Sequence, residues 1–241
     1  MIKQIKKLKP DIIFLDTERK AEGKRSLDDL KPDVWKFIEE YSKITDKIAI
    51  EVSPYTNDLG RLKENFEKEF ISIDKKLNRL TLYLNKLKKS DRSAVSLPSI
   101  TRLENKNVKS AELADSASSS SYLYVIDPAI PMAELINELA DELKYRAKII
   151  EFNGRNYFLS KELLNSSFIE AYKILSVTEN KFESILDELK KIDAKSVVIR
   201  YSIDPKEYWK ERKNYESKLS GTRKVHLFAN KEAILCESLA Y

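Results

Sequence analysis

Short apolar runs alternate with amphipathic stretches in the first part of the chain. The run at 11–15 is β-branched and aromatic and stops at Asp16, which predicts a strand buried on both faces, as in parallel sheets. Asp33 is a candidate N-cap for a helix to about Tyr41, in which apolar residues recur at helical spacing. A second strand is predicted at 47–52. Strand, helix and strand in this order predict a βαβ unit with a right-handed crossover.

The segments that follow have connections too short for crossovers. They predict a short helix at 59–67 and antiparallel strands at 70–73, 80–84 and 93–98. The small, polar stretch SAELADSASSSS at 110–121 predicts the main domain boundary. The rest of the chain predicts an α+β region with short, mostly antiparallel sheets: strands at 122–126, 171–177 and 196–201, helices at 130–143 and 180–192, a third helix opened by Asp204-Pro205, and hairpins at 147–159 and 224–237.

Composition narrows the class of protein. The chain has 241 residues, enough for two units and a small third one. Four Gly, one Cys and 34% charged residues are typical of a thermophile's cytoplasm, and the net charge of +5 permits a nucleic-acid partner without requiring one. Because Cys236 is the single cysteine of the sequence, an internal disulfide and a Cys-rich zinc site are excluded. Its apolar neighbours predict that the thiol is buried. No apolar run approaches the roughly 18 residues of a membrane span, and no signal peptide is recognisable.

Polar residues follow both predicted parallel strands. Asp16 and Arg19 come after the first strand, and Ser53 and Pro54 come after the second. Because ligands bind outside the carboxyl ends of strands in open α/β sheets, these residues are candidates for a shared site. The alternative is a solvated loop in which Asp16 and Arg19 form a structural pair.

Two groups of residues are candidates for binding nucleic acid. Lys20, Lys24 and Arg25 follow the first strand. The second group combines cations with aromatic residues, as a stacking platform for single-stranded RNA requires, and consists of Arg200, Tyr208, Trp209, Arg212, Lys213, Arg223 and Lys224. The alternative is that Tyr208 and Trp209 belong to the core. His226 alternates with apolar neighbours and is predicted to point out of a strand, with no partner that would make it a general base.

Several segments, read in order, resemble one family of proteins. LDTERKAEGKRSLDDLKP at 15–32 is similar to the DPARR…GRR…L-D…P segment of bacterial and archaeal class I methyltransferases with a THUMP-like C-terminal domain. IEVSPY at 50–55 resembles the family's IK-x-SPG element, and the segments 70–72 and 80–84 resemble its EW-x-S…E-x-x-L-W hairpin. SYLYVIDPAI at 121–130 is similar to its YLYEPDPAV element. The segments 197–207 and 219–221 resemble the I-K-x-R…DPE…L…G pattern of the THUMP-like module.

This resemblance implies a fold, a chemistry and a substrate class. The implied fold is α/β plus α+β: a truncated, Rossmann-like methyltransferase domain at 1–109, a Ser-rich linker at 110–121, a ferredoxin-like segment at 122–165 and a THUMP-like α+β domain at 166–241. RNA is the implied substrate class. The implied catalytic residues are Asp16, Arg19, Ser53 and Pro54, with Asp16 as the base or substrate-orienting group and Arg19 pairing with it or with a phosphate.

The departures from the family pattern concern the cofactor. Thr17 stands where the family has Pro, Glu51 where it has Lys, and Tyr55 where it has Gly. The first predicted strand corresponds to the family's fourth, so the half that binds S-adenosylmethionine is expected to be missing, and the sequence contains no G-x-G. We therefore expect no cofactor to be bound by this chain alone, no metal, and S-adenosylmethionine only if a partner completes the site.

Three functional hypotheses follow. The first is a degenerate methyltransferase-like module, cytoplasmic and without activity, that binds RNA or a protein partner. The second is a subunit of a split RNA methyltransferase, in which a partner pairs with the strand at Asp11 and supplies the cofactor loop. The third is a protein-interaction scaffold in a replication or translation complex.

Overall fold

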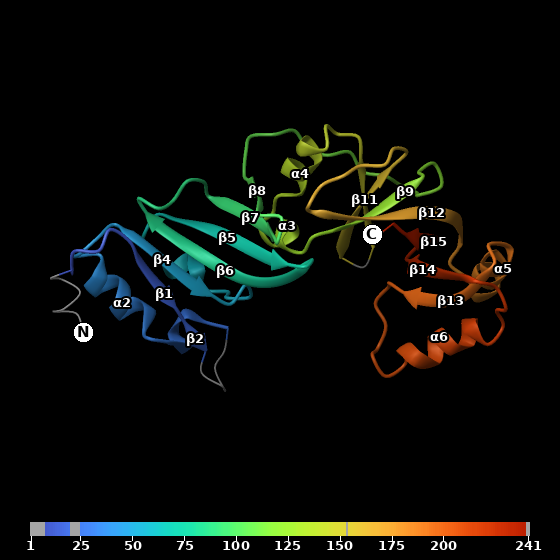
Figure 1. The fold of residues 1–241 in the computed structure, drawn as a ribbon, viewed down its shortest axis with the longest axis horizontal. Coiled ribbons are helices and arrows are strands. Elements are labelled where there is room, and N and C mark those ends of the chain that lie inside the picture. Colours follow the sequence, from blue (N-terminus) through green and yellow to red (C-terminus); the bar gives the residue numbers. More distant parts are fainter. Residues whose placement is uncertain (1–7, 20–24, 153, 240–241) are drawn as a thin grey trace. The chain divides into compact units, whose positions relative to one another are not determined.

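The computed structural model describes residues 8–19, 25–152 and 154–239 (Figure 1). The chain forms two compact units. Unit 1 contains Met1–Val108 and Asp127–Leu139, and unit 2 contains Lys109–Ile126 and Ala140–Tyr241. Among the described residues, no helix has both the length and the apolar character that crossing a bilayer requires.

Unit 1 is built on a six-stranded sheet with the order β1-β4-β6-β5-β7-β8. Its strands are β1 (Ile13–Asp16), β4 (Lys47–Val52), β5 (Phe66–Ile73), β6 (Lys76–Asn85), β7 (Arg92–Leu97) and β8 (Thr101–Glu104). Two short strands, β2 (Glu18–Arg19) and β3 (Leu30–Lys31), form a separate ribbon. The parallel pair β1 and β4 is joined through helix α2 (Val34–Tyr41), so the predicted strand–helix–strand unit is confirmed.

Helix α2 forms for the reasons that the sequence indicates. The Asp33 carboxylate accepts a hydrogen bond from the backbone N–H of Lys36 at 3.0 Å, which satisfies one of the free donors of the first turn. Val34, Ile38 and Tyr41 are buried, and their spacing places them on one face of the helix. The cap and the apolar periodicity therefore predict both ends of α2 correctly.

The prediction that the first strand is buried on both faces is wrong. β1 lies at the edge of the sheet, and the side chains of Ile12 and Phe14 are 55% and 56% exposed. Leu15, on the opposite face, is buried. An apolar run therefore did not distinguish a central strand from an edge strand with an uncovered face.

The prediction that the later strands of unit 1 are all antiparallel is also wrong. β5 and β6 do form an antiparallel hairpin around Asp74 and Lys75, which both have positive φ. β6 then returns the chain to the end where β5 began, so β7 can pair with β5 in parallel without a helical crossover. The helix expected at 59–67 is a 3-10 turn, η2 (Leu59–Arg61), and β5 already begins at Phe66.

Charged side chains are buried in the sheet of unit 1. Glu67 and Glu69 on β5 are 1% and 6% exposed, and the Arg102 guanidinium forms ion pairs with both of them. Glu67 also accepts a hydrogen bond from the Ser93 hydroxyl at 2.6 Å, and Glu69 accepts one from the Tyr83 hydroxyl at 2.7 Å. Arg102 therefore supplies the positive charge that balances both buried carboxylates.

Asp127 ties a second segment of the chain to this sheet. Its carboxylate, 1% exposed, accepts hydrogen bonds from the Ser72 hydroxyl at 2.6 Å and from the backbone N–H of Ala129 at 2.9 Å. Helix α3 (Ala129–Met132), which follows, packs against β5 and β7. This contact explains why 127–139 belongs to unit 1.

Unit 2 is built on a seven-stranded sheet with the order β10-β11-β9-β12-β15-β14-β13. Its strands are β9 (Tyr122–Ile126), β10 (Lys148–Phe152), β11 (Arg155–Ser160), β12 (Ile169–Glu179), β13 (Ala194–Ile199), β14 (Arg223–Ala229) and β15 (Glu232–Ser238). All pairs are antiparallel except β13 and β14. Helix α5 (Phe182–Lys191) packs against β12 and β13, and helix α6 (Tyr208–Glu216) packs against β13.

The sheet of unit 2 curls strongly. Tyr157 on β11 and Phe228 on β14 have ring centroids 5.7 Å apart, although three strands separate β11 from β14 in the sheet. The concave side encloses a core that includes Leu123, Tyr172 and Cys236. Cys236 is fully buried, as predicted, and burial raises the pKa of its thiol.

The domain division differs from the predicted one in two respects. The stretch 110–121 is packed into unit 2: Ala117 is fully buried and its N–H donates to the Glu232 carboxylate at 2.5 Å. The expected segments 122–165 and 166–241 share one sheet, because β9 lies between β11 and β12. The ferredoxin-like and THUMP-like arrangements stay predictions.

The helix expected at 130–143 is interrupted. It consists of α3 and α4 (Ile136–Glu142), separated at Glu134, which has φ of +56°. The predicted apolar face is nevertheless buried, including Ile130, Leu135 and Leu139.

Candidate functional site

The carboxyl ends of β1 and β4 meet at one edge of the unit 1 sheet. The two strands pair in parallel, with Asp16 opposite Glu51. Ser53 and Pro54 follow directly after β4, so the predicted placement of Asp16 and Ser53-Pro54 on one edge is confirmed. Their catalytic roles stay predictions.

Hydrogen bonds at this edge leave Asp16 as the accessible carboxylate. The Glu51 carboxylate is paired with the Arg79 guanidinium at 2.7 Å, and the Thr17 hydroxyl donates to the Glu51 carbonyl at 2.6 Å. Asp16 itself is exposed. The Ser53 hydroxyl accepts a hydrogen bond from the N–H of Tyr55 at 3.3 Å, which fixes the turn after β4. Asp16 can therefore accept a hydrogen bond from a molecule outside the sheet.

The loops that follow β1 and β4 are held together by Asp58. Its carboxylate accepts from the Ser26 hydroxyl at 2.7 Å and from the Leu27 N–H at 2.9 Å. Arg61 pairs with Asp58 at 2.9 Å and with Asp28 at 2.7 Å. Burial alone would raise the pKa of Asp58, but the hydrogen bonds from Ser26, Leu27 and Arg61 outweigh it and lower that pKa. These hydrogen bonds and ion pairs therefore hold the loops after β1 and β4 in a defined arrangement.

The first group of predicted nucleic-acid residues is only partly described. Lys20 and Lys24 lie outside the described residues. Arg19 lies in β2, opposite Leu30 of β3. The Arg25 guanidinium stacks on the ring of Tyr55, 4.6 Å from its centroid. This contact places one cation and one aromatic ring beside the loop after β4.

Glycine positions test whether unit 1 could cradle S-adenosylmethionine. A cofactor loop needs glycines where the backbone approaches the ligand closely. Of the described glycines, Gly154 forms the turn between β10 and β11 with φ of +73°, and Gly221 packs so closely on Asp193 that a Cβ would lie 2.2 Å from its carbonyl oxygen. Gly60 borders open space. The described part of the chain thus offers no glycine cradle at the ends of β1 and β4, and within it no group of three or more His, Cys, Asp or Glu could hold a metal ion.

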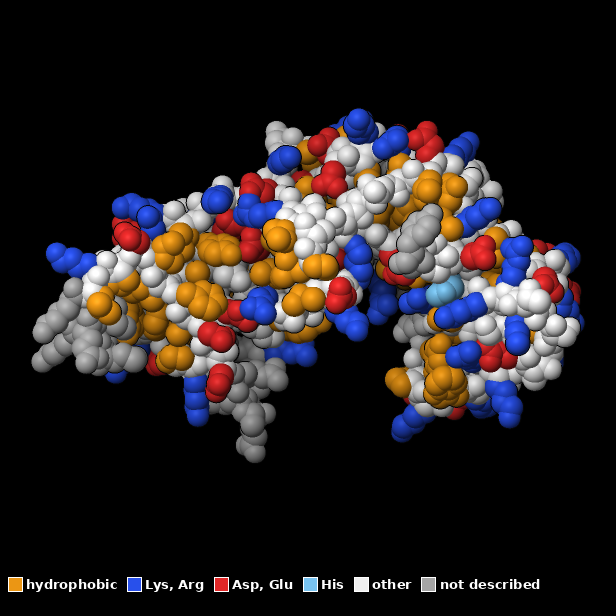
Figure 2. Space-filling view, in the orientation of Figure 1, with side chains coloured by type: hydrophobic (Ala, Val, Ile, Leu, Met, Phe, Trp, Pro, Cys, Tyr) orange, Lys and Arg blue, Asp and Glu red, His pale blue; other side chains and the backbone are white. Residues whose placement is uncertain are grey.

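In unit 2, helix α6 carries an exposed aromatic side chain among cations. Trp209 is 68% exposed, and the Arg212 guanidinium lies 5.3 Å from its ring centroid while pairing with Glu216 at 2.7 Å. Tyr208 contacts Trp209 edge-on at 5.3 Å and packs partly against the core. Figure 2 shows hydrophobic side chains over α6 with Lys and Arg around them. Trp209 therefore has the exposure that stacking requires, and Tyr208 has it only in part.

The remaining predicted cations lie on β14, after β13 and on α6. Arg223 and Lys224 begin β14, and Arg223 lies opposite Ala194 at the start of β13. Arg200 follows the other end of β13, six residues beyond Ala194, which is about 20 Å at the usual rise per residue. Lys213 is exposed on α6. Arg200 and Lys224 nevertheless both lie near His226, whose pKa their charges lower, and a binding role for these residues stays a prediction.

His226 points out of β14 on the face opposite Val225 and Leu227, as predicted, but it is buried there. The residue is 6% exposed, its Nδ1 accepts a hydrogen bond from Arg200 Nε at 3.1 Å, and its ring lies 5.0 Å from that of Tyr172. Burial, together with the positive charges of Arg200 and Lys224, lowers the pKa of His226 to about 4. The imidazole is thus neutral at pH 7 and holds Arg200 in place.

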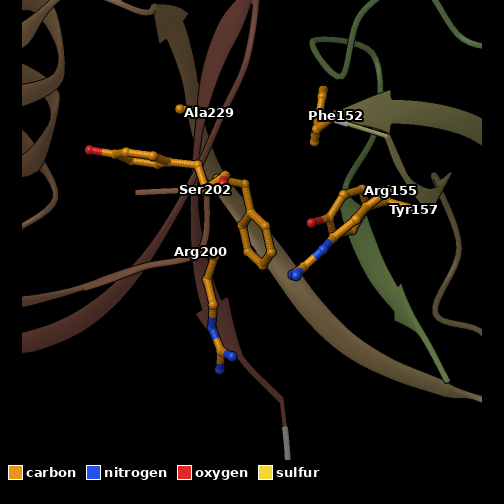
Figure 3. A pocket seen from close by; sticks show the side chains of 8 residues that line it. Phe152, Arg155, Tyr157, Arg200, Ser202 and Ala229 are labelled. Atoms are coloured by element: carbon orange, nitrogen blue, oxygen red, sulfur yellow. The ribbon is translucent and has the colours of Figure 1, made fainter. Parts of the chain in front are cut away.

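A pocket in unit 2 contains residues that the sequence did not single out. It encloses about 140 Å³ and is lined by Arg155 and Tyr157 from β11 and by Arg200 and Ser202 after β13, with aromatic and small residues between them (Figure 3). The turn signal Asn153-Gly154 predicted the hairpin that carries Arg155. It gave no indication that this hairpin faces Arg200.

Comparison with known proteins finds a solved structure with a similar fold. No protein-family model and no curated protein matches the chain. Among solved structures, the chain is similar to a crystal structure described as a "putative methyltransferase" from Porphyromonas gingivalis W83, with a TM-score of 0.70 and 17% identity. The match covers 98% of this chain and 61% of that chain, so the protein spans 61% of its neighbour's length.

This similarity concerns the fold. At 17% identity it shows that the two proteins share a fold, and it shows that alone. The chain is a mixed α/β protein with two sheet-dominated regions. The finer resemblance to methyltransferases with a THUMP-like domain stays a prediction.

Proposed function

We propose that this protein is the RNA-associated subunit of an S-adenosylmethionine-dependent methyltransferase. In this proposal another polypeptide pairs with β1 and supplies the cofactor-binding loop. The fold shared with the Porphyromonas gingivalis protein supports the methyltransferase part. Asp16 is the group of this chain that would orient the RNA nucleophile and take its proton, with Ser53 and Pro54 beside it.

The open edge of β1 is the observation that carries the partner part. Among the described strands, β1 pairs only with β4. Ile12 and Phe14 lie two residues apart, hence on one face, and more than half of each side chain is exposed. Unpaired backbone groups beside exposed apolar side chains favour the addition of a strand. A partner strand here would lie next to Asp16.

Phe14→Lys tests this proposal. The tagged full-length protein and two variants are recovered from the native cells, irradiated with labelled S-adenosylmethionine, and supplied with RNA. With the unmodified protein we expect label on a second polypeptide and labelled methyl groups in the RNA. Phe14→Lys should lose both signals at least tenfold. Ile100→Lys is the matched control, because Ile100 is 77% exposed in unit 1 but lies between β7 and β8, away from the edge.

Two results would contradict the proposal. Label on this chain in the absence of any other polypeptide would mean that it binds the cofactor itself. No label on any polypeptide recovered with the unmodified protein would remove the enzyme part. Thermal unfolding of Phe14→Lys should match that of the unmodified protein, since the side chain is largely exposed.

A second candidate function is RNA binding without methyl transfer. The exposed Trp209 and the neighbouring Arg212 on α6 favour it, because base stacking on an aromatic ring needs no chemistry. The two candidates differ in one measurement. RNA bound by the purified chain, with no methyl transfer in any recovered complex, would support the second.

A further inference from the structure

The pocket in unit 2 has two walls that come from distant parts of the sequence. One wall is the hairpin of β10 and β11, with Phe152, Arg155 and Tyr157. The other consists of residues after β13 and at the end of β14, including Arg200 and Ser202. Figure 3 shows Arg155 extending from its strand toward the wall that carries Arg200 and Ser202. The curl of the sheet brings the walls together, as the contact between Tyr157 and Phe228 indicates.

Arg200 is held in a fixed position. Its Nε donates to His226 Nδ1 at 3.1 Å, and its Nη2 donates to the Tyr172 hydroxyl at 2.9 Å. The Tyr172 hydroxyl donates in turn to the Glu170 carboxylate at 2.7 Å. A guanidinium has five N–H donors, and these two bonds leave others for a ligand. The neutral imidazole orients Arg200 without neutralising its charge.

The lining is positive and partly aromatic. Arg155 is an exposed residue, and its positive charge acts to lower the pKa of Tyr157, although burial raises that pKa overall. The residues that line the pocket include two arginines and no Asp or Glu. Arginine forks match the geometry of phosphate oxygens, and the Ser202 hydroxyl is a further donor.

The size of the pocket limits what enters it. The pocket has a volume of about 140 Å³. That is below the roughly 300 Å³ of pockets that enclose whole small molecules. One phosphate fits, while the sugar and base of a nucleotide would lie outside the pocket.

We propose that this pocket binds the phosphate group of a nucleotide, clamped between Arg155 and Arg200. Because RNA association belongs to the proposed function, the ligand in the cell would be one nucleotide of the RNA substrate. The pocket then anchors the RNA through unit 2, separately from the edge at Asp16 in unit 1.

His226 provides a direct readout, because it is the one His in the chain and contacts Arg200. The full-length protein is titrated at pH 7 with adenosine monophosphate, adenosine and inorganic phosphate while the imidazole signals are followed by NMR. We expect a saturable shift with the monophosphate, a weaker one with inorganic phosphate, and none with adenosine. A shift with adenosine equal to that with the monophosphate would overturn the proposal.

Arg155→Gln tests the clamp with little risk to the fold, since Arg155 is exposed. Affinity for the monophosphate should fall about tenfold or more, as expected for a lost charge-assisted hydrogen bond. Lys195→Gln is the matched control: it removes the same charge from an exposed residue near the start of β13, whereas Arg200 follows the other end of that strand, and affinity should stay within about twofold. Equal losses in both variants would indicate general charge attraction and overturn the clamp.

Single-stranded RNA separates this inference from the function on which it rests. If RNA binds the full-length protein but the monophosphate does not shift His226, the pocket proposal fails and RNA association stands. If the monophosphate binds and RNA does not, the pocket stands and RNA association fails.

Discussion

Replacing Arg102 by Leu should destabilise unit 1 strongly, because two buried carboxylates would lose their counter-charge. Arg102 pairs with Glu67 and with Glu69, both of which are buried. Removing one partner of a buried ion pair costs about 3–5 kcal/mol of unfolding free energy. The Arg102 side chain is itself 27% exposed, so water can reach the vacated position. The expected loss is therefore near the lower end, about 3 kcal/mol.

The loss should depend on pH in a defined direction. Burial acts to raise the pKa of Glu67, but hydrogen bonds from Ser93 and two backbone N–H groups and the charge of Arg102 lower it overall. In the unmodified protein this carboxylate therefore stabilises the fold above its unfolded pKa, and the stabilisation is lost as pH falls. Without Arg102, protonation relieves a buried charge. The difference between Arg102→Leu and the unmodified protein should thus shrink from pH 7 to about pH 4.5.

The two tryptophans allow unit 1 to be followed alone. Trp35 lies on α2 in unit 1, and Trp209 lies in unit 2, so urea unfolding is measured by fluorescence in a Trp209→Phe background. Arg79→Leu is the control, because its pair with Glu51 is 41% and 20% exposed and should be worth under about 1 kcal/mol. A loss for Arg102→Leu no larger than that of the control, or one that grows at low pH, would refute the reasoning.

Two further predictions concern unit 2. Trp209→Ala should weaken the binding of single-stranded RNA about tenfold, measured by fluorescence anisotropy, because stacking contributes about 1–3 kcal/mol per base. The free energy of unfolding should stay unchanged. Leu163→Ala is the control: Leu163 is 56% exposed, and its replacement should change neither RNA binding nor stability. His226 should titrate by NMR near its lowered pKa of about 4, rather than 6.5. Because the unfolded chain binds this proton first, unfolding free energy should fall as pH drops from about 6.5 to 4, and less so in His226→Gln; a pKa near 6.5 would contradict the buried position.

Local signals in the sequence predicted most helices and strands, but they seldom predicted which strands lie next to one another in a sheet. The Asp33 cap and the spacing of Val34, Ile38 and Tyr41 fix α2 within a few residues, since both act inside the helix. Which strand lies at an edge depends on the partners available. The exposure of Phe14 and the parallel pairing of β7 therefore could not be read from their own segments.

The same distinction applies to the candidate sites. Asp16 and Ser53 were placed together because parallel neighbours bring their carboxyl ends to one edge, a rule that needs only the βαβ pattern. The proximity of Arg155 and Arg200 depends on the curl of a seven-stranded sheet, which no local pattern encodes. For His226, alternation with Val225 and Leu227 gave the correct face of β14, but that face turned out to be covered by Tyr172.

The path of the chain between its two units has a consequence for how they could be separated. The chain leaves unit 1 after Val108, builds β9 in unit 2, returns for 127–139, and leaves again. No single cut therefore releases either unit intact: a fragment ending at Val108 would keep Ser72 without Asp127, and the remainder would carry α3 without the strands against which it packs. The two units alternate along the chain, so a continuous segment that contains all of one unit also contains part of the other, and neither unit can be transferred to another protein alone.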